Sequence, residues 1–403
     1  MNLILERARS VDASWGQITK FSCALKTPKT EPLRTAFLVT SMPVGGAETL
    51  LVNLVRGFDP AKVQPQIVCL KEPGPLGDEL ASEFLVASNF INSKWDIAVI
   101  PKLRRHFLKH RIDAVVTVGA GDKMFWGRIA ARLASVPVIC SALHSTGWPD
   151  GVGRANRLLT GITDAFIGVA ESHGKFLVDF ERFPNRKVAV IPNGIDTHRF
   201  RPDSVARAEV RRELNISSTA AVIGIVAALR PEKNHEMFVE VAARVQRVMP
   251  DSQFLIIGEG PERKKIEEAI CKHSLQSNIQ LLGNRSDTQR ILAAIDVFAL
   301  TSHNEANPVS ILEALATEVP VVSTRVGSIS ETVINDETGY CVNPGDLETM
   351  ASQIQKLILD PQKRRHLGGK GRLRVQERGS LASMITGYED LLLRIHASKY
   401  RRS

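Results

Sequence analysis

Residues 297–323 read VFALTSHNEANPVSILEALATEVPVVS, and they indicate the fold of the chain. The apolar run 297–300 predicts a buried strand that ends in a polar turn. Asn307 is placed to act as the N-cap of a following helix, and Pro308 suits its first position, where the missing N–H costs nothing. The β-branched run 319–323 predicts a second strand. A strand, a helix and a strand in this order are typical of a βαβ unit in a parallel sheet.

The same alternation of short β-branched runs and longer helical patterns extends from Arg34 onward and forms two series. The first series predicts strands at 35–40, 66–70, 114–118, 136–141, 165–169 and 188–191. The second predicts strands at 221–227, 253–257, 279–282, 297–300 and 319–323. A polar, Arg-rich stretch that opens with the turn dipeptide Asn193-Gly194 lies between them and places a domain boundary near residue 200. The sequence therefore predicts an α/β protein of two doubly wound, Rossmann-like domains with ligand sites at the carboxyl ends of the strands.

The composition is that of a packed globular protein, with 43% hydrophobic and 24% charged residues among 403. Five cysteines without a C-x-x-C pair exclude a disulfide framework and a zinc ribbon, and they favour a reducing, cytoplasmic location. The longest uncharged apolar stretch, 220–229, is about half as long as a bilayer-spanning helix. Residues 1–33 carry Glu6, Arg7, Arg9 and Asp12 where a signal peptide needs an apolar run. They are expected to form a loosely ordered leader.

The helix that starts at Pro308 would point its free amides, those of Val309 and Ser310, back toward the end of the preceding strand. Such a helix N-terminus is a favourable site for a diphosphate. Glu305 lies on the loop before this helix and Glu313 more than one turn inside it. The two carboxylates would therefore have different partners, one a sugar hydroxyl and the other a ribose. The spacing leaves one alternative open, a capped helix with an acidic, solvated face.

Further motifs accompany this pair of glutamates in a fixed order. They are Gly45-Gly46-Ala47-Glu48, Asn193-Gly194-Ile195-Asp196, Gly258-Glu259-Gly260-Pro261, Gly283, Gly327, Glu331 and Gly339. Together with Glu305-x7-Glu313 they resemble the retaining GT-B glycosyltransferases of glycosyltransferase family 4, over roughly residues 34–345. The resemblance implies two Rossmann-like domains that face a cleft.

The organisation implied by this family has four parts. Residues 1–33 are the leader, 34–200 form an acceptor-binding domain, and 201–380 form a nucleotide-sugar-binding domain. Residues 381–403, in which apolar residues recur at helical spacing, form a C-terminal helix that crosses back toward the first domain.

The resemblance assigns catalytic roles to Glu305, His144 and Lys233. His144 would contact the transferred sugar, and Lys233 would offset charge on the leaving diphosphate. The implied donor-binding residues are Gly45, Gly46, Asn193, Arg230, Lys233, Asn307, Val309, Ser310 and Glu313. Without the family, His144 would be an ordinary loop or core residue, Arg230 and Lys233 would be surface cations, and the glycine pair would be a routine turn.

Three positions depart from the family pattern. The arginine usually found five residues before Lys233 is Ala228 here, and Arg230 would project to the same side of an extended backbone and take over the contact. Glu318 stands where a glycine usually ends the helix, so it must adopt a positive φ at a cost of about 1 kcal/mol, or the helix must end differently. Ser328 replaces a second glycine, which alters how closely the backbone approaches the sugar.

Neither a metal nor another cofactor is expected. The chain has no Asp-x-Asp sequence and no His/Asp/Glu cluster at metal-binding spacing. Lys233, Arg230 and the helix amides would supply the positive charge instead.

The predicted enzyme is a hexosyltransferase that moves a sugar from a nucleoside diphosphate sugar to a glycan or lipid-linked acceptor, with retention of anomeric configuration. The alternatives are a GT-B nucleotide-sugar epimerase and a catalytically silent nucleotide-sugar-binding protein, for which Ala228 is the best sequence evidence. Nucleic acid is not expected as a partner because aromatic residues, which would stack on bases, make up only 5% of the chain.

The net charge of +9 is unevenly distributed. Residues 101–200 carry 15 basic against 8 acidic residues, residues 363–403 carry 11 against 3, and residues 201–362 carry 16 against 22. The two basic regions are expected to form one face for an anionic membrane surface, with Leu103, Phe107 and Leu108 near it, on the cytoplasmic side. Solvated helix faces are the alternative.

Overall fold

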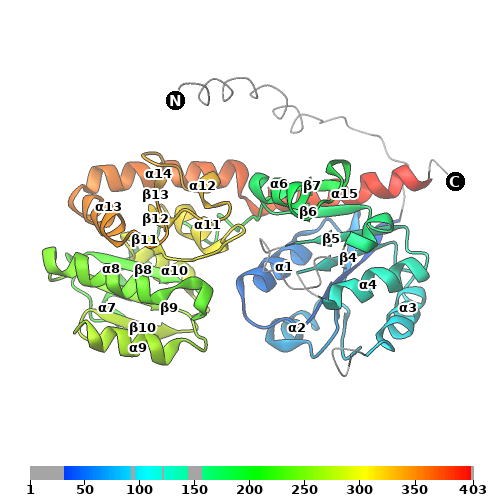
Figure 1. Ribbon diagram of the computed structural model, residues 1–403, viewed down its shortest axis with the longest axis horizontal. Helices are drawn as coiled ribbons and strands as arrows, with labels where there is room; N and C mark the ends of the chain where they lie inside the picture. Colours follow the sequence, from blue (N-terminus) through cyan, green and yellow to red (C-terminus); the bar gives the residue numbers. More distant parts are fainter. Residues whose placement is uncertain (1–30, 92–95, 120–121, 144–156, 401–403) are drawn as a thin grey trace, which may run out of the picture.

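The computed structural model describes residues 31–91, 96–119, 122–143 and 157–400. Within these ranges the chain forms two α/β domains, each built on a parallel sheet (Figure 1). The first sheet has seven strands in the order β3-β2-β1-β4-β5-β6-β7, and the second has six in the order β10-β9-β8-β11-β12-β13. In each sheet the winding reverses near the middle, between β1 and β4 and between β8 and β11. The prediction of two doubly wound domains is therefore confirmed.

The strands of the first domain are β1 (Leu33–Val39), β2 (Val63–Cys69), β3 (Val86–Ala87), β4 (Ala114–Val118), β5 (Val138–Ala142), β6 (Ala165–Gly168) and β7 (Val188–Val190). Its helices are α1 (Gly46–Gly57), α2 (Gly74–Leu80), α3 (Val99–Lys109), α4 (Asp122–Leu133) and α6 (Glu171–Asp179).

The strands of the second domain are β8 (Val222–Val226), β9 (Gln253–Ile257), β10 (Ile279–Gly283), β11 (Val297–Leu300), β12 (Val321–Thr324) and β13 (Gly339–Val342). Its helices are α7 (Ser204–Glu213), α8 (His235–Val248), α9 (Arg263–Lys272), α10 (Thr288–Ala294), α11 (Val309–Ala316), α12 (Ile329–Thr332), α13 (Leu347–Leu359) and α14 (Pro361–Arg378), and α15 (Leu381–Tyr400) follows.

The strand β1 shows why these apolar runs form buried strands. Phe37 packs into the core shared with α1 and α15, and the next residue, Leu38, packs into the core shared with α3 and α4. Successive side chains of a strand point to opposite faces, so a strand covered by helices on both sides needs apolar residues throughout. All eleven predicted strands are present, with ends displaced by three residues at most. The strands β3 and β13 were not predicted because the first has two residues and the second begins with a glycine.

The C-terminal helix α15 returns to the first domain, as Figure 1 shows in red. Met384, Tyr388 and the residues that follow them on one face of α15 belong to the core of that domain. The buried Glu389 carboxylate accepts hydrogen bonds from the Asp59 amide at 2.8 Å and from Lys62 Nζ at 2.7 Å. A buried carboxylate with two donors ties α15 to the loop before β2.

The two chain segments that connect the domains lie side by side. The Ile195 amide donates to the Gly379 carbonyl, and the Leu381 amide donates to the Ile195 carbonyl, both at 2.9 Å. A Cβ at Gly194 would lie 2.3 Å from the Ser380 carbonyl oxygen, so only glycine allows this approach. The domains are therefore joined by one paired connection.

One expectation about the chain surface was wrong. Leu103 and Phe107 are 0% and 1% exposed and belong to the core between α3 and the sheet, so only Leu108, at 47%, contributes to a surface. The helix α14, which carries much of the C-terminal positive charge, packs on α11 and α13 of the second domain. Most of the C-terminal basic residues therefore lie with the second domain, whereas Lys399 of α15 pairs with Asp164 of the first domain.

Glu318 takes the first of the two conformations considered for it. Its φ is 61°, in the left-handed region, after α11 ends at Ala316. The helix thus ends as it would with glycine, and the strain is carried by the backbone of Glu318.

Candidate active site

Lys233 and Glu305 form an ion pair at the carboxyl ends of two neighbouring strands. Lys233 ends the short helix η3 (Pro231–Lys233) after β8, and Glu305 lies on the loop after β11. Lys233 Nζ lies 2.6 Å from Glu305 Oε1, and the Ser302 hydroxyl donates to the same oxygen at 2.7 Å. The two charged side chains are only 23% and 8% exposed, so water weakens their attraction less than at an open surface.

The two loops that carry this pair are hydrogen-bonded to each other. The Thr301 hydroxyl donates to the carbonyl oxygens of Lys233, at 3.2 Å, and Asn234, at 2.9 Å. The His303 amide donates to the Glu232 carbonyl at 2.8 Å. The backbone on both sides of the ion pair is therefore held in place, which limits the conformational entropy that the long Lys233 side chain must lose.

A third segment, the turn after β12, supports the Glu305 loop. Gly327 has a φ of 53°, and a Cβ there would lie 1.5 Å from the Glu305 carbonyl oxygen. Only glycine permits both the conformation and the approach. The Ser328 hydroxyl, at the position of the second family glycine, donates to the Ala306 carbonyl.

The helix α11 starts at Val309, one residue later than the sequence predicts, and Asn307 does not cap it. Pro308 occupies the N-cap position, and no side chain caps the helix there. Asn307 Nδ2 instead donates to the Val169 carbonyl of the first domain at 2.7 Å, and its own carbonyl accepts a hydrogen bond from Asn193 Nδ2 at 2.8 Å. Tertiary contacts at the domain interface thus compete successfully with local capping. Val309, the next residue after Pro308, packs against the cores of both domains.

Glu313 lies half-buried on α11, and burial raises its pKa to about 7, although the Arg199 cation acts in the opposite direction. No hydrogen bond to this carboxylate comes from a residue within the described ranges. A carboxylate in this state can accept hydrogen bonds from hydroxyl groups once it is ionised.

Gly45 and Gly46 open α1 on the first-domain side of the interface. A Cβ at Gly46 would lie 4.0 Å from Val309 Cγ2, so the starts of α1 and α11 are neighbours. The Glu48 side chain turns back toward Gly45. Burial raises the pKa of Glu48, whereas its own backbone amide and the cation of Arg230, from the second domain, lower it. The expected glycine loop is therefore next to an acidic side chain.

The structure brings the expected residues together in two groups. Lys233 and Glu305 are paired, and Gly46, Val309, Asn307 and Asn193 meet at the domain interface. Arg230 stays outside both groups, since its side chain is 62% exposed and its nearest acidic oxygen, on Glu232, is 4.0 Å away. His144 lies outside the described residues. The contact of Ser302 with Glu305 was not predicted, because a serine three residues before a glutamate has no distinguishing pattern.

Two family profiles match consecutive parts of the chain. Residues 44–199 match Glycosyltransferase Family 4, and residues 206–374 match Glycosyl transferases group 1. The chain is a family 4, group 1 glycosyltransferase. The family indicated by the sequence motifs is confirmed.

Curated relatives and solved structures are similar to this glycosyltransferase over most of its length. The Escherichia coli UDP-Gal:alpha-D-GlcNAc-diphosphoundecaprenol alpha-1,3-galactosyltransferase is 27% identical over 311 residues, 73% of this chain and 80% of that protein. The GDP-mannose-dependent alpha-(1-6)-phosphatidylinositol monomannoside mannosyltransferase of Mycolicibacterium smegmatis is 26% identical over 287 residues, 68% and 74% of the two chains. Anabaena Alr3699/HepE in complex with UDP matches with a TM-score of 0.80 and 20% identity, over 90% of this chain and 100% of that one. The fold is GT-B, as predicted.

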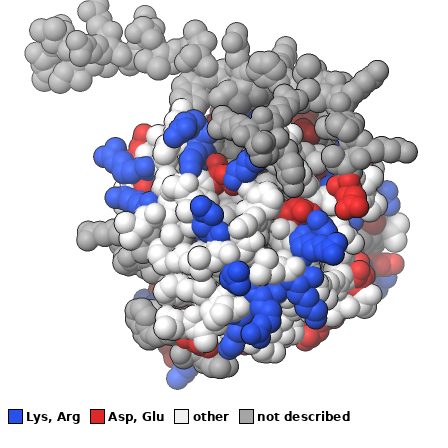
Figure 2. Space-filling view, turned by 90° about the vertical axis from the view of Figure 1, so that its right-hand side faces the viewer, with Lys and Arg blue, Asp and Glu red and all other residues white. Residues whose placement is uncertain are grey.

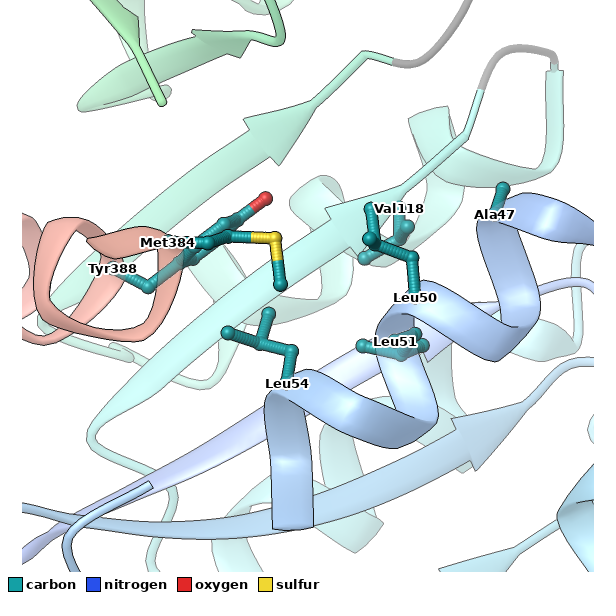
Figure 3. Close-up of a pocket in the computed structure, with 7 residues that line it drawn as sticks. All are labelled: Ala47, Leu50, Leu51, Leu54, Val118, Met384 and Tyr388. Carbon is teal, nitrogen blue, oxygen red and sulfur yellow. The ribbon is translucent and has the colours of Figure 1, made fainter. Parts of the chain in front are cut away.

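An apolar pocket of the glycosyltransferase lies on the first-domain side. It is lined by Ala47, Leu50, Leu51, Leu54, Val118, Met384 and Tyr388. Figure 3 shows Met384 and Tyr388 of α15 opposite the leucines of α1. Burial raises the pKa of Tyr388, so its hydroxyl stays protonated at neutral pH. The pocket adds no charged group to the candidate site.

Gly327→Ala tests whether the turn after β12 supports the Glu305 loop. The added Cβ would collide with the Glu305 carbonyl, so the melting temperature should fall, with a loss of unfolding free energy of about 2 kcal/mol or more. Gly369→Ala, in α14 with no atom within 4 Å of the new Cβ, is the control and should be neutral or stabilising. Equal melting temperatures for the two variants would show that the turn after β12 does not support the Glu305 loop.

Proposed function

We propose that this glycosyltransferase moves a hexose from a nucleoside diphosphate sugar to an acceptor bound by the first domain, with retention of anomeric configuration. The observation that carries the proposal is the Lys233–Glu305 pair at the carboxyl ends of β8 and β11, beside the start of α11. This is the winding reversal of the second sheet, where ligands of open α/β sheets bind. The names of the relatives, which act with UDP-Gal and GDP-mannose, and the UDP complex of the Anabaena structure support a nucleotide-sugar donor.

The positively charged groups and the carboxylate at the site would have different roles. The Lys233 ammonium and the amides of Val309 and Ser310, in the first turn of α11, would stabilise the negative charge that develops on the leaving diphosphate. Glu305 would hold Lys233 and accept hydrogen bonds from the transferred sugar, and His144 would contact that sugar. In a front-face displacement the leaving phosphate oxygen takes the acceptor proton, so no protein nucleophile is required.

We also propose that the reaction needs no metal ion, because placed cations and amides can serve the diphosphate. In the part of the chain that the structure describes, no three His, Cys, Asp or Glu side chains gather so as to hold a metal ion. Ala228 favours a second candidate, a nucleotide-sugar-binding protein without turnover, since it removes a cation that the family usually has. Release of nucleoside diphosphate only when an acceptor is present would exclude this candidate and an epimerase.

The donor site is tested by a thermal-shift screen with UDP-, GDP- and ADP-sugars. At 100 times its Kd, a bound donor stabilises by about 2.7 kcal/mol and should raise the melting temperature by a few degrees. Glu305→Ala and Lys233→Ala should abolish this rise, because each removes one half of the pair. Lys272→Ala, on the exposed face of α9, is the control and should leave the rise unchanged. If no nucleotide sugar stabilises the unmutated protein, the donor site is wrong.

Donor affinity should depend on pH through Glu313. Its pKa is raised to about 7, so below that pH the carboxyl is mostly protonated and accepts ribose hydroxyls poorly. The Kd of the donor found in the screen should therefore fall about tenfold from pH 6 to pH 8. Glu313→Gln, which cannot ionise, should remove this dependence. A variant that keeps the full pH dependence would show that another group titrates.

We propose a lipid-linked acceptor, supported by two relatives whose named acceptors are a diphosphoundecaprenol and a phosphatidylinositol mannoside. None of the helices in the described ranges is long and apolar enough to cross a membrane.

The outer side of α3 carries the exposed residues Arg104, Arg105, Leu108 and Lys109. Arg104 Nε donates to the Leu133 carbonyl, and the Leu133 side chain is itself 54% exposed. Figure 2 shows Lys and Arg side chains gathered at this end of the molecule. Cations around exposed apolar groups suit the cytoplasmic surface of an anionic membrane.

Vesicle sedimentation tests this surface. Arg104→Ala, Arg105→Ala and Lys109→Ala combined should weaken binding to vesicles with anionic lipid about 100-fold, at about 1 kcal/mol per removed cation. Lys264→Ala with Lys272→Ala, on α9 of the second domain, is the control. Equal binding of the unmutated protein to neutral vesicles would contradict an electrostatic attachment.

A further inference from the structure

Glu331 of the second domain binds the first turn of α6 in the first domain. Its Oε2 accepts the Glu171 amide at 2.9 Å, and its Oε1 accepts the Ser172 amide at 2.7 Å. The first amides of a helix have no intrahelical acceptor, and the helix dipole favours an anion there. One carboxylate thus satisfies two orphan amides across the domain interface.

Asn307 binds Val169, which lies two residues before the first residue of α6. Its Nδ2 donates to the Val169 carbonyl at 2.7 Å. The short segment after β6, from Val169 to Ser172, is therefore held at both ends by side chains of the second domain. Asn193, next to the paired connection, donates to the Asn307 carbonyl and fixes its backbone.

Both side chains belong to segments that position Glu305. Asn307 lies two residues after Glu305 on the same loop. Glu331 lies on α12, which follows the Gly327 turn, and that turn touches the Glu305 carbonyl and bonds to Ala306. A shift of the first domain relative to the second would displace the Glu305 loop through two contacts, those of Asn307 and Glu331.

Among the residues that the structure describes, these interdomain contacts are polar, with Val309 as an apolar residue packed against both cores. Such an interface can open and close, because the groups that separate gain water in return. The paired connection of 194–195 with 379–381 provides a narrow hinge for that motion.

We propose that Glu331 and Asn307 are positioning residues that latch the two domains in the arrangement in which Glu305 and Lys233 are set for transfer. The effect on transfer rests on the proposed function, whereas the latch itself does not. Neither residue needs to touch the donor. Closure of the domains then also fixes the loop that carries Glu305.

Hydrogen exchange of the free protein tests the latch without any donor. Glu331→Ala should raise the exchange rate of the Glu171 and Ser172 amides about tenfold or more. Asn307→Ala should raise it as well, although Asn307 does not touch either amide. A rise in Glu331→Ala alone would show a local bond and overturn the latch, as would no rise in either. Glu337→Ala, at an exposed glutamate between α12 and β13, is the control and should leave these amides protected.

Kinetics then test the coupling to Glu305. Both variants should lower kcat about tenfold while the donor Kd changes less than about threefold, because donor contacts lie mostly in the second domain. Glu331→Gln, which retains an acceptor oxygen, should recover part of kcat. Fast exchange with unchanged kcat would overturn the coupling. If the unmutated protein transfers no sugar, the proposed function fails, and the exchange result still decides the latch.

Discussion

The contact between Lys233 Nζ and Glu305 Oε1 is the interaction on which the site depends. A mostly buried charge is tolerated only with a partner, and removal of one member of such a pair leaves the other at a cost of several kcal/mol. The loops after β8 and β11 must therefore bring Lys233 and Glu305 within contact distance of each other. The bonds from Thr301 to the Lys233 loop, and the close packing of Gly327 on Glu305, meet that requirement. The carboxyl ends of β8, β11 and β12 act here as one unit.

This arrangement explains how a locally acidic domain could recognise an anion. Residues 201–362 have more acidic than basic side chains, so the long-range field of the domain does not attract a diphosphate. Recognition would rest on one ammonium group and the first amides of α11, at short range and largely shielded from water.

The domain interface has a different character from the two cores. The cores are apolar and continuous, whereas the interface uses side-chain amides, a carboxylate and backbone groups from segments that follow strands. The return of α15 to the first domain and the pairing of the two connections attach the domains independently of these polar contacts. The chain thus separates the groups that stabilise each domain from those that set the relative position of the domains.

The sequence alone determined the order of strands and helices, the two domains, and the strand ends at which ligands would bind. These features follow from local periodicity and from turn residues, which act over a few neighbours. Only the tertiary structure decided which side chains and backbone groups contact each other. Lys233 and Glu305 are 72 residues apart, and Glu331 and Glu171 are 160 apart. Asn307 has the local pattern of an N-cap but bonds across the interface, and Leu103 and Phe107, on a basic helix, face inward because the sheet lies on that side. Side-chain partners depend on packing between distant segments, and no local pattern encodes that packing.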